Sequence, residues 1–184
     1  IDWKNSQEFK PLADNFDPVV ASKLPDPIFD PTTKSSEHDN PISKNEIISS
    51  NMLSKKDFDF LKKKSIELYL KMSNIVNLAG FLMADVKFEY GFNRNGEIVL
   101  GDSLGPDEYR LWKKIHYQKG SIQESYDKQI LRDWLTNVGF KKKVREHKSY
   151  DTKPQPPKLP SSLIRKISQR YILAYEMITG DKIK

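Results

Sequence analysis

Charged and apolar residues alternate along residues 85–90, and this segment is where the sequence first indicates chemistry. Residues two positions apart share a face of an extended strand, so we expect Asp85, Lys87 and Glu89 to line up. Carboxylates are the oxygen ligands that suit Mg²⁺, and a lysine beside them can neutralise a phosphate or a carboxylate. The same pattern fits a solvated strand face with an ordinary ion pair, and the residues alone leave both interpretations open.

A turn sequence at 93–96 predicts that this strand folds back as a hairpin, with 97–102 as its second strand. If the loop covers 93–96, Phe92 pairs with Glu97 and Lys87 lies opposite Asp102. Glu89 and Asp102 are then diagonal neighbours on one face, about 7–8 Å apart. Two carboxylates at that separation can hold Mg²⁺ directly or through water, together with phosphate oxygens.

Arg110 follows Asp102 closely enough to reach the same end of the hairpin. Arginine can grip a phosphate or a carboxylate with two parallel hydrogen bonds. The competing interpretation is a surface arginine that stacks on Trp112.

Lys128 and Arg132 are four residues apart on a predicted helix and therefore share a face. Like charges at this spacing are slightly destabilising unless an anion lies between them, so one interpretation is an anion site. Alternatively, Asp127 or Asp133 offsets the two cations.

A further group of polar residues, Lys34, His38 and Asp39, lies in the proline-rich opening of the chain. His38-Asp39 followed by Asn40-Pro41 is first of all a turn signal. By itself His38 fits a surface or structural histidine better than a catalyst.

The elements that must position these residues are helices and one hairpin, which together predict an α+β fold with a small antiparallel sheet backed by helices. We expect helices at 54–79, 125–138 and 161–179, the first capped by Ser54 with Asp57. The expected apolar faces consist of Phe58, Leu61, Leu68, Met72, Ile75 and Leu78; of Tyr126, Ile130, Leu131, Trp134, Leu135 and Val138; and of Ile164, Ile167, Tyr171, Ala174, Tyr175 and Ile178.

The remaining segments are predicted to be irregular. Residues 1–50 are loop-rich, with short strands possible at 19–20 and 28–29, and we separate them from a lobe at 51–184. Residues 103–123 read as a loop. Residues 151–160 contain four prolines and read as an extended connector.

Composition excludes several classes of site. The 184 residues contain no cysteine, which excludes disulfides, thiolate metal sites and a cysteine nucleophile.

The net charge of +6 suits an anionic partner. The most basic run, 141–148, is interpreted as a solvated surface segment, and no apolar run is long enough to span a membrane. Because the chain begins with Ile1-Asp2 instead of methionine, we expect it to be a piece of a longer protein.

Several of these motifs, taken in order, resemble the SAICAR synthetase family, the phosphoribosylaminoimidazole-succinocarboxamide synthases of purine biosynthesis. The resemblance runs from about Lys23 to Gly180 and rests on 85–89, 99–102 and 106–112, with flanking matches at 23–29, 33–39, 125–135 and 170–180. Two residues depart from the family pattern: Ser103 replaces an acidic residue, and Tyr109 replaces a serine.

This resemblance implies a cytoplasmic ATP-dependent ligase that joins L-aspartate to carboxyaminoimidazole ribonucleotide and releases SAICAR, ADP and phosphate. ATP and Mg²⁺ are the implied cofactors. The implied metal ligands are Glu89 and Asp102, and the implied catalytic residues are Asp85 and Lys87. The implied substrate-binding residues are Lys34, His38, Asp39, Arg110, Lys128 and Arg132.

The family's N-terminal nucleotide-binding lobe is not matched, so we expect it to be missing from this chain and the isolated chain to be inactive. An alternative function is a non-catalytic basic module that binds nucleic acid or a protein partner. The enzyme interpretation expects neither a membrane nor a nucleic-acid partner.

Overall fold

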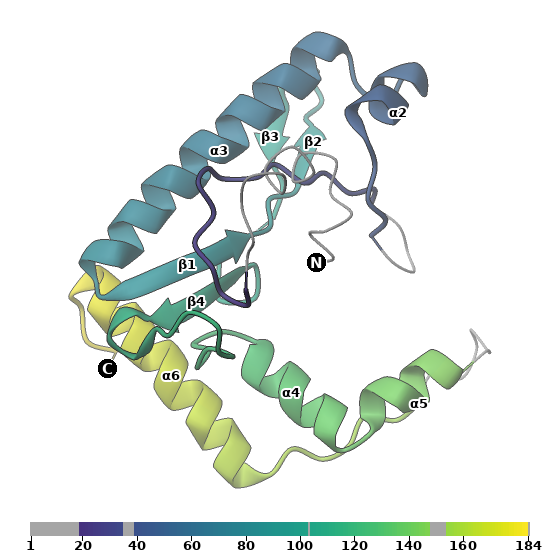
Figure 1. The fold of residues 1–184 in the computed structure, drawn as a ribbon. Helices are drawn as coiled ribbons and strands as arrows, with labels where there is room; N and C mark the ends of the chain where they lie inside the picture. The colour runs from purple at the N-terminus through teal and green to yellow at the C-terminus, as the bar shows by residue number, and fades with distance from the viewer. Residues whose placement is uncertain (1–18, 35–38, 103, 148–153, 184) are drawn as a thin grey trace. The chain divides into compact units, whose positions relative to one another are not determined.

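A computed structural model describes residues 19–34, 39–102, 104–147 and 154–183. Its elements are mixed helices and short strands, as the α+β prediction required (Figure 1). In chain order they are α2 Lys44–Ser49, α3 Lys55–Leu78, β1 Phe81–Val86, β2 Tyr90–Phe92, β3 Ile98–Leu100, β4 Tyr109–Lys113, the 3₁₀ helix η2 Lys114–His116, α4 Gln129–Asn137, α5 Phe140–Glu146 and α6 Ser161–Thr179. None of the helices in the described residues is both long and apolar enough to cross a bilayer.

The chain forms two compact units, one of residues 1–72 with 118–122 and one of 73–117 with 123–184. The division after residue 50 that composition indicated stays a prediction. In the first unit, the segments around Val19 and Phe29 are not strands, contrary to expectation. Instead, Phe29 packs edge-on against Phe58 of α3, with ring centroids 5.7 Å apart.

Helix α3 begins and ends where the sequence indicated. The Ser54 hydroxyl donates to the Asp57 carboxylate at 2.6 Å and accepts from the Asp57 backbone N–H at 3.1 Å. The predicted apolar face is wrong at its end, because Ile75 and Leu78 are exposed while Val76 is buried. A period of 3.6 residues carries the buried face from Leu61 through Ser65 to Val76 and leaves 75 and 78 off that face.

The second unit contains two separate antiparallel pairs, β1 with β4 and β2 with β3. The prediction of a loop over 103–123 is therefore wrong, because β4 lies within it. Phe81 and Leu111, one from each strand of the first pair, are fully buried, and the Phe81 ring packs on Tyr126 with centroids 5.4 Å apart. This apolar centre anchors both strands that carry site residues.

Among the last three helices, α4 begins later than predicted, α5 was not predicted as a helix, and α6 has the predicted bounds. Helix α4 begins at Gln129 and not at 125, because Ser125 forms a bridge with Trp112 of β4. Helix α6 has Pro160 at its N-cap instead of a serine, and it ends at Gly180 with φ +80°, as predicted. The basic run through residue 147 is exposed, as expected, and most of it forms α5.

Candidate active site

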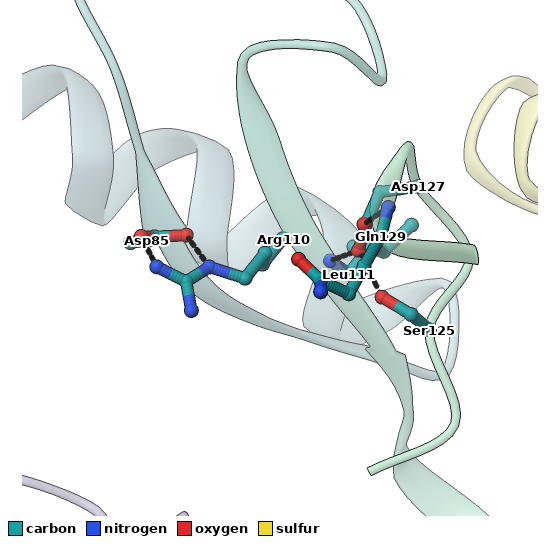
Figure 2. A network of polar contacts seen from close by, with 6 residues as sticks. All are labelled: Asp85, Arg110, Leu111, Ser125, Asp127 and Gln129. Carbon is teal, nitrogen blue, oxygen red and sulfur yellow. Dashed lines mark hydrogen bonds and ion pairs between the residues drawn. The ribbon is translucent and has the colours of Figure 1, made fainter. Parts of the chain in front are cut away.

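Asp85 of β1 and Arg110 of β4 form a bidentate ion pair across the first strand pair (Figure 2). The arginine Nε donates to Asp85 Oδ1 at 2.9 Å and Nη2 donates to Oδ2 at 2.5 Å. Both side chains remain partly accessible, with exposures of 38% for Arg110 and 34% for Asp85. The pair uses Nε and Nη2, so the Nη1 N–H groups lie outside it and can meet an anion.

An irregularity in β1 brings these two residues opposite one another. Met83 pairs with Leu111, but Asp85 pairs with Arg110, so the register shifts by one residue at Ala84. A bulge of this kind re-aims the side chains that follow it. Without the shift, Asp85 would lie opposite Tyr109. The sequence predicted that Arg110 reaches the end of the hairpin near Asp102; the structure instead pairs it with Asp85 through β4, a strand that was not predicted.

Lys87 and Glu89 lie between β1 and β2, where the chain leaves one strand pair and enters the other. The Lys87 ammonium lies 2.7 Å from a Glu89 carboxylate oxygen, and the Lys87 backbone N–H donates to the Glu108 carbonyl at 2.7 Å. The Glu89 side chain is 24% exposed. These contacts hold a cation and a carboxylate close to Asp85 in the chain.

The register predicted for the hairpin is wrong by one residue. Phe92 pairs with Ile98 and not with Glu97. The cause is the Asn93 side chain, whose oxygen accepts from the backbone N–H groups of Asn95 and Glu97 and so draws Glu97 into the turn. Lys87 is consequently not opposite Asp102, and the argument from diagonal neighbours does not hold.

Glu89 and Asp102 nevertheless come to the same end of the hairpin. The Gly101 N–H donates to the Glu89 carbonyl at 2.8 Å, so Asp102 is next to the residue that faces Glu89. The chain bends at Asp102, which is exposed. Carboxylates are the donors that Mg²⁺ prefers, but the register places Gly101 and not Asp102 opposite Glu89, so it does not put the two carboxylates on one face of the hairpin. No cluster of three or more acidic or histidine ligands occurs among the described residues.

Lys128 and Arg132 begin α4, and both precede the basic α5 helix. Lys128 is at the N-cap position, where its carbonyl accepts from the Arg132 N–H at 3.2 Å. Of the two carboxylates that could offset them, Asp133 is exposed and accepts from the Gln129 side chain at 2.7 Å, while Asp127 is fully buried. Asp127 is therefore not a surface counter-ion for these cations.

Asp127 is the buried polar centre of this region, although its sequence context indicated no role for it beyond charge balance. Its Oδ2 accepts from the Leu111 N–H at 2.8 Å and from the Ser125 hydroxyl at 2.5 Å, and its Oδ1 accepts from the Gln129 N–H at 2.7 Å (Figure 2). An aspartate two residues before a helix start is a capping signal that could have indicated part of this role.

Arg170 of α6 holds the segment 124–126, which leads into Asp127. Its guanidinium donates to the Glu124 carboxylate and to the Ser125 carbonyl, and it lies 5.0 Å from the centre of the Tyr126 ring. The Arg170 side chain is largely buried. Residues 124–126 are thereby held from the α6 side by one cation.

Two tyrosines close enough to Asp127 to feel its charge have a raised pKa and are therefore neutral. Burial raises the pKa of Tyr171 to about 12, with the negative charge of Asp107 adding to the effect. The Tyr171 hydroxyl donates to Asp107 at 3.3 Å. Burial also raises the pKa of Tyr109, and the Asp127 charge acts in the same direction. Tyr109, one of the two departures from the family pattern, is therefore a half-buried neutral group next to Arg110.

Lys34 and Asp39 belong to the other compact unit. Close to them in the chain, Thr32 and Pro41 form a bridge, and the Thr33 N–H donates to the Asn40 carbonyl at 2.8 Å. Both side chains are exposed. His38 lies outside the described residues. The turn predicted over His38-Asp39-Asn40-Pro41 includes His38 and stays a prediction.

Comparison with known proteins identifies the family. A family model described as SAICAR synthetase matches residues 13–147. A phosphoribosylaminoimidazole-succinocarboxamide synthase of Nitrosopumilus maritimus is 48% identical over 98% of this chain and 65% of its own length. A SAICAR synthase structure from Saccharomyces cerevisiae, complexed with SAICAR, matches with a TM-score of 0.68 at 32% identity, covering 89% of this chain and 50% of that one.

A third match, at 23% identity and a TM-score of 0.61, is a SAICAR synthetase in complex with ADP; it covers 88% of this chain and 55% of that one and shows the common fold. The chain thus spans between half and two thirds of the length of these proteins. The matched region contains the predicted site residues of the second unit, from Asp85 to Arg132. The chain belongs to the SAICAR synthetase family.

Proposed function

We propose that this chain carries part of the active site of an ATP-dependent ligase, which joins the amino group of L-aspartate to the carboxylate of carboxyaminoimidazole ribonucleotide. The observation that supports this most is the close succession of two ion pairs, Asp85 with Arg110 and Lys87 with Glu89, at the end of β1. Both lie within the region matched by the family. The alternative of a non-catalytic basic module is not favoured, because its only support is the exposed surface of α5 and the net charge.

The chemistry needs activation because a carboxylate is a poor electrophile. A carboxylate oxygen of the ribonucleotide attacks the γ-phosphorus of ATP, and ADP leaves. The aspartate amine then attacks the acyl carbon, loses a proton, and expels phosphate as the amide bond forms. Each step concentrates negative charge on phosphoryl oxygens, so catalysis depends on fixed cations and on alignment of the reactants.

The residues of the second unit have distinct roles in this proposal. Lys87 neutralises charge on the transferring phosphoryl group, and the ion pair with Glu89 holds its ammonium in place. Asp85 orients Arg110, whose outer N–H groups bind a carboxylate or phosphate of the substrate. Lys128 and Arg132 at the start of α4 bind the ribonucleotide's anionic groups.

Glu89 and Asp102 are the residues that would hold Mg²⁺, because both are carboxylates at one hairpin end. When bound, the ion would neutralise ATP phosphate oxygens and help to fix their orientation. ATP use is supported by the resemblance and by the family member whose structure contains ADP. Lys34, His38 and Asp39 are proposed to border the nucleotide and amino-acid pockets, and a cytoplasmic location is proposed because the substrates are soluble metabolites.

A further part of the proposal is that an N-terminal lobe of the family completes the ATP site. The relatives are longer than the region matched here, which leaves room for such a lobe. Residues 1–184 expressed alone should then form no SAICAR, and adding the lobe as a second chain should restore activity if the two dock. Robust turnover by residues 1–184 alone would overturn this part.

The activity itself is tested with the gene product that contains residues 1–184. Incubated with ATP, Mg²⁺, carboxyaminoimidazole ribonucleotide and L-aspartate, it should produce SAICAR, detected by mass spectrometry, with one ADP and one phosphate per product. Omitting any one substrate should abolish the product. A folded protein that yields no SAICAR, or yields it without ATP, would refute the proposed activity.

A further inference from the structure

Asp127 joins two parts of the second unit that carry proposed substrate-binding residues. One of its backbone donors, Leu111, directly follows Arg110 on β4, and the other, Gln129, directly follows Lys128 at the start of α4. A single side chain thus connects the backbone next to Arg110 with the backbone next to Lys128 (Figure 2).

Because Asp127 is buried, water cannot replace its side chain as a hydrogen-bond acceptor for these backbone groups. The residue has no exposed surface, and its hydrogen-bond partners are two backbone N–H groups and one hydroxyl. Both carboxylate oxygens accept from a backbone N–H. An amide NH₂ group in place of either oxygen would face an N–H donor and could not accept its hydrogen bond. Removing an acceptor would leave a buried N–H unpaired, an arrangement that folded proteins rarely tolerate.

Asp127 also caps the N-terminus of α4. Lys128 has helical backbone angles and no side-chain cap, whereas Asp127 accepts from the N–H two residues further on, as N-cap side chains do. The position of Lys128 and, one turn later, of Arg132 therefore depends on the same carboxylate that holds β4 at Leu111. Contacts from α6 through Arg170 hold the segment before it.

We propose that Asp127 is a positioning residue for ribonucleotide binding: it sets the distance between Arg110 and the Lys128–Arg132 pair without touching substrate. This inference rests on the proposed function, because it assigns those cations to the ribonucleotide's anionic groups. A displacement of about 1 Å in such groups can cost about 10²-fold in rate. The loss should concern the ribonucleotide and not ATP.

The first test uses Asp127→Asn in the gene product that contains residues 1–184, with Asp133→Asn as the matched control. The control makes the same change at an exposed position of α4. We expect Asp127→Asn to lower kcat/KM for carboxyaminoimidazole ribonucleotide by about 10–100-fold, since a small displacement has that scale of effect. KM for ATP should stay within about twofold of wild type, because the cations that Asp127 positions are assigned to the ribonucleotide and not to ATP. Asp133→Asn should match wild type in both.

A double-mutant cycle with Lys128→Ala separates positioning from a general structural role. If Asp127 acts through the placement of Lys128, Asp127→Asn should cost much less in the Lys128→Ala background than in wild type. Fully multiplicative losses would overturn the proposal, as would equal losses for ATP and ribonucleotide, or an Asp127→Asn variant that behaves like the control.

A second variant covers the case in which Asp127→Asn does not fold. Asp127→Ser keeps an N-cap acceptor for Gln129 but is too short to bind Leu111 as well. It should fold and show the same selective loss for the ribonucleotide. If neither variant folds, Asp127 serves the fold and the proposal is wrong. A wild-type protein that forms no SAICAR would instead refute the proposed activity, so the two failures are distinguishable.

Discussion

Arg110 binds both carboxylate oxygens of Asp85, and the two residues lie opposite each other only because β1 shifts its register at Ala84. The ion pair is half-exposed, so its contribution to stability is small, on the order of 1 kcal/mol or less for pairs of this kind. Its main effect is therefore on orientation: it aligns a guanidinium whose remaining N–H groups can bind an anion.

Asp85→Asn should separate these two effects. The amide cannot accept two charged hydrogen bonds, so Arg110 loses its fixed orientation, and we expect kcat/KM to fall by about 10²-fold. The free energy of unfolding should change by about 1 kcal/mol or less. Steady-state kinetics and urea denaturation measure the two quantities.

The control for Asp85→Asn is Glu146→Gln, which alters an exposed ion pair with Lys142 on α5. It should change neither activity nor stability measurably. If Asp85→Asn kept full activity, the orienting role of the Asp85–Arg110 pair would be excluded.

The core between β1 and β4 gives a prediction about stability alone. Leu111 is fully buried, and Leu111→Ala should lower the free energy of unfolding by about 2–5 kcal/mol through lost burial and the cavity that remains. Ile115→Ala, at a position 81% exposed, should lie within about 0.5 kcal/mol of wild type. Equal effects of the two substitutions in chemical denaturation would contradict the assignment of this core.

Acid stability should depend on Asp59 of α3. Hydrogen bonds from Lys44 and Lys55 lower its pKa from 3.8 to about 2. The folded state thus favours the carboxylate, and this stabilisation is present above about pH 4 and disappears as the pH falls toward 2. Asp59→Asn should be less stable than wild type at pH 6, with the difference vanishing near pH 2.

The measurement for Asp59 is urea unfolding at a series of pH values from about 2 to about 6, because the stabilisation is lost between the two pKa values, 3.8 and about 2, and is constant above them. Asp133→Asn serves as the comparison: Asp133 accepts a hydrogen bond from the uncharged Gln129 side chain, so its substitution should change the pH dependence of stability little. A stability difference for Asp59→Asn that stays constant across this range would show that the lysine contacts do not favour the charged form.

Local signals in the sequence predicted the parts of the fold that local interactions determine. The start of α3 follows from Ser54 and Asp57, and the end of α6 follows from Gly180, because each is a contact or backbone conformation within a few residues. The turn at 93–96 was found for the same reason. Its register was wrong because the Asn93 side chain extends the turn to Glu97.

The candidate site was predicted in part. Alternation along 85–89 identified its charged residues, but the partner of Asp85 lies 25 positions away on β4, and pairing at that separation leaves no local pattern. The bulge at Ala84 and the burial of Asp127 were also missed, because each depends on packing between strands and helices that the sequence analysis had not placed together. The metal assignment of Glu89 and Asp102 stays a prediction.

The most direct test of the account is the turnover number of Glu89→Gln beside that of Glu97→Gln, measured as SAICAR formation at saturating substrates and Mg²⁺. Both substitutions neutralise one carboxylate of the same hairpin, but Glu97 is exposed in the turn, where it contacts Asn93. If the end of β1 and the adjoining hairpin carry the chemistry, Glu89→Gln should lower kcat by about 10²–10³-fold with little change in stability, and Glu97→Gln should match wild type. Equal turnover by the two variants would contradict the account.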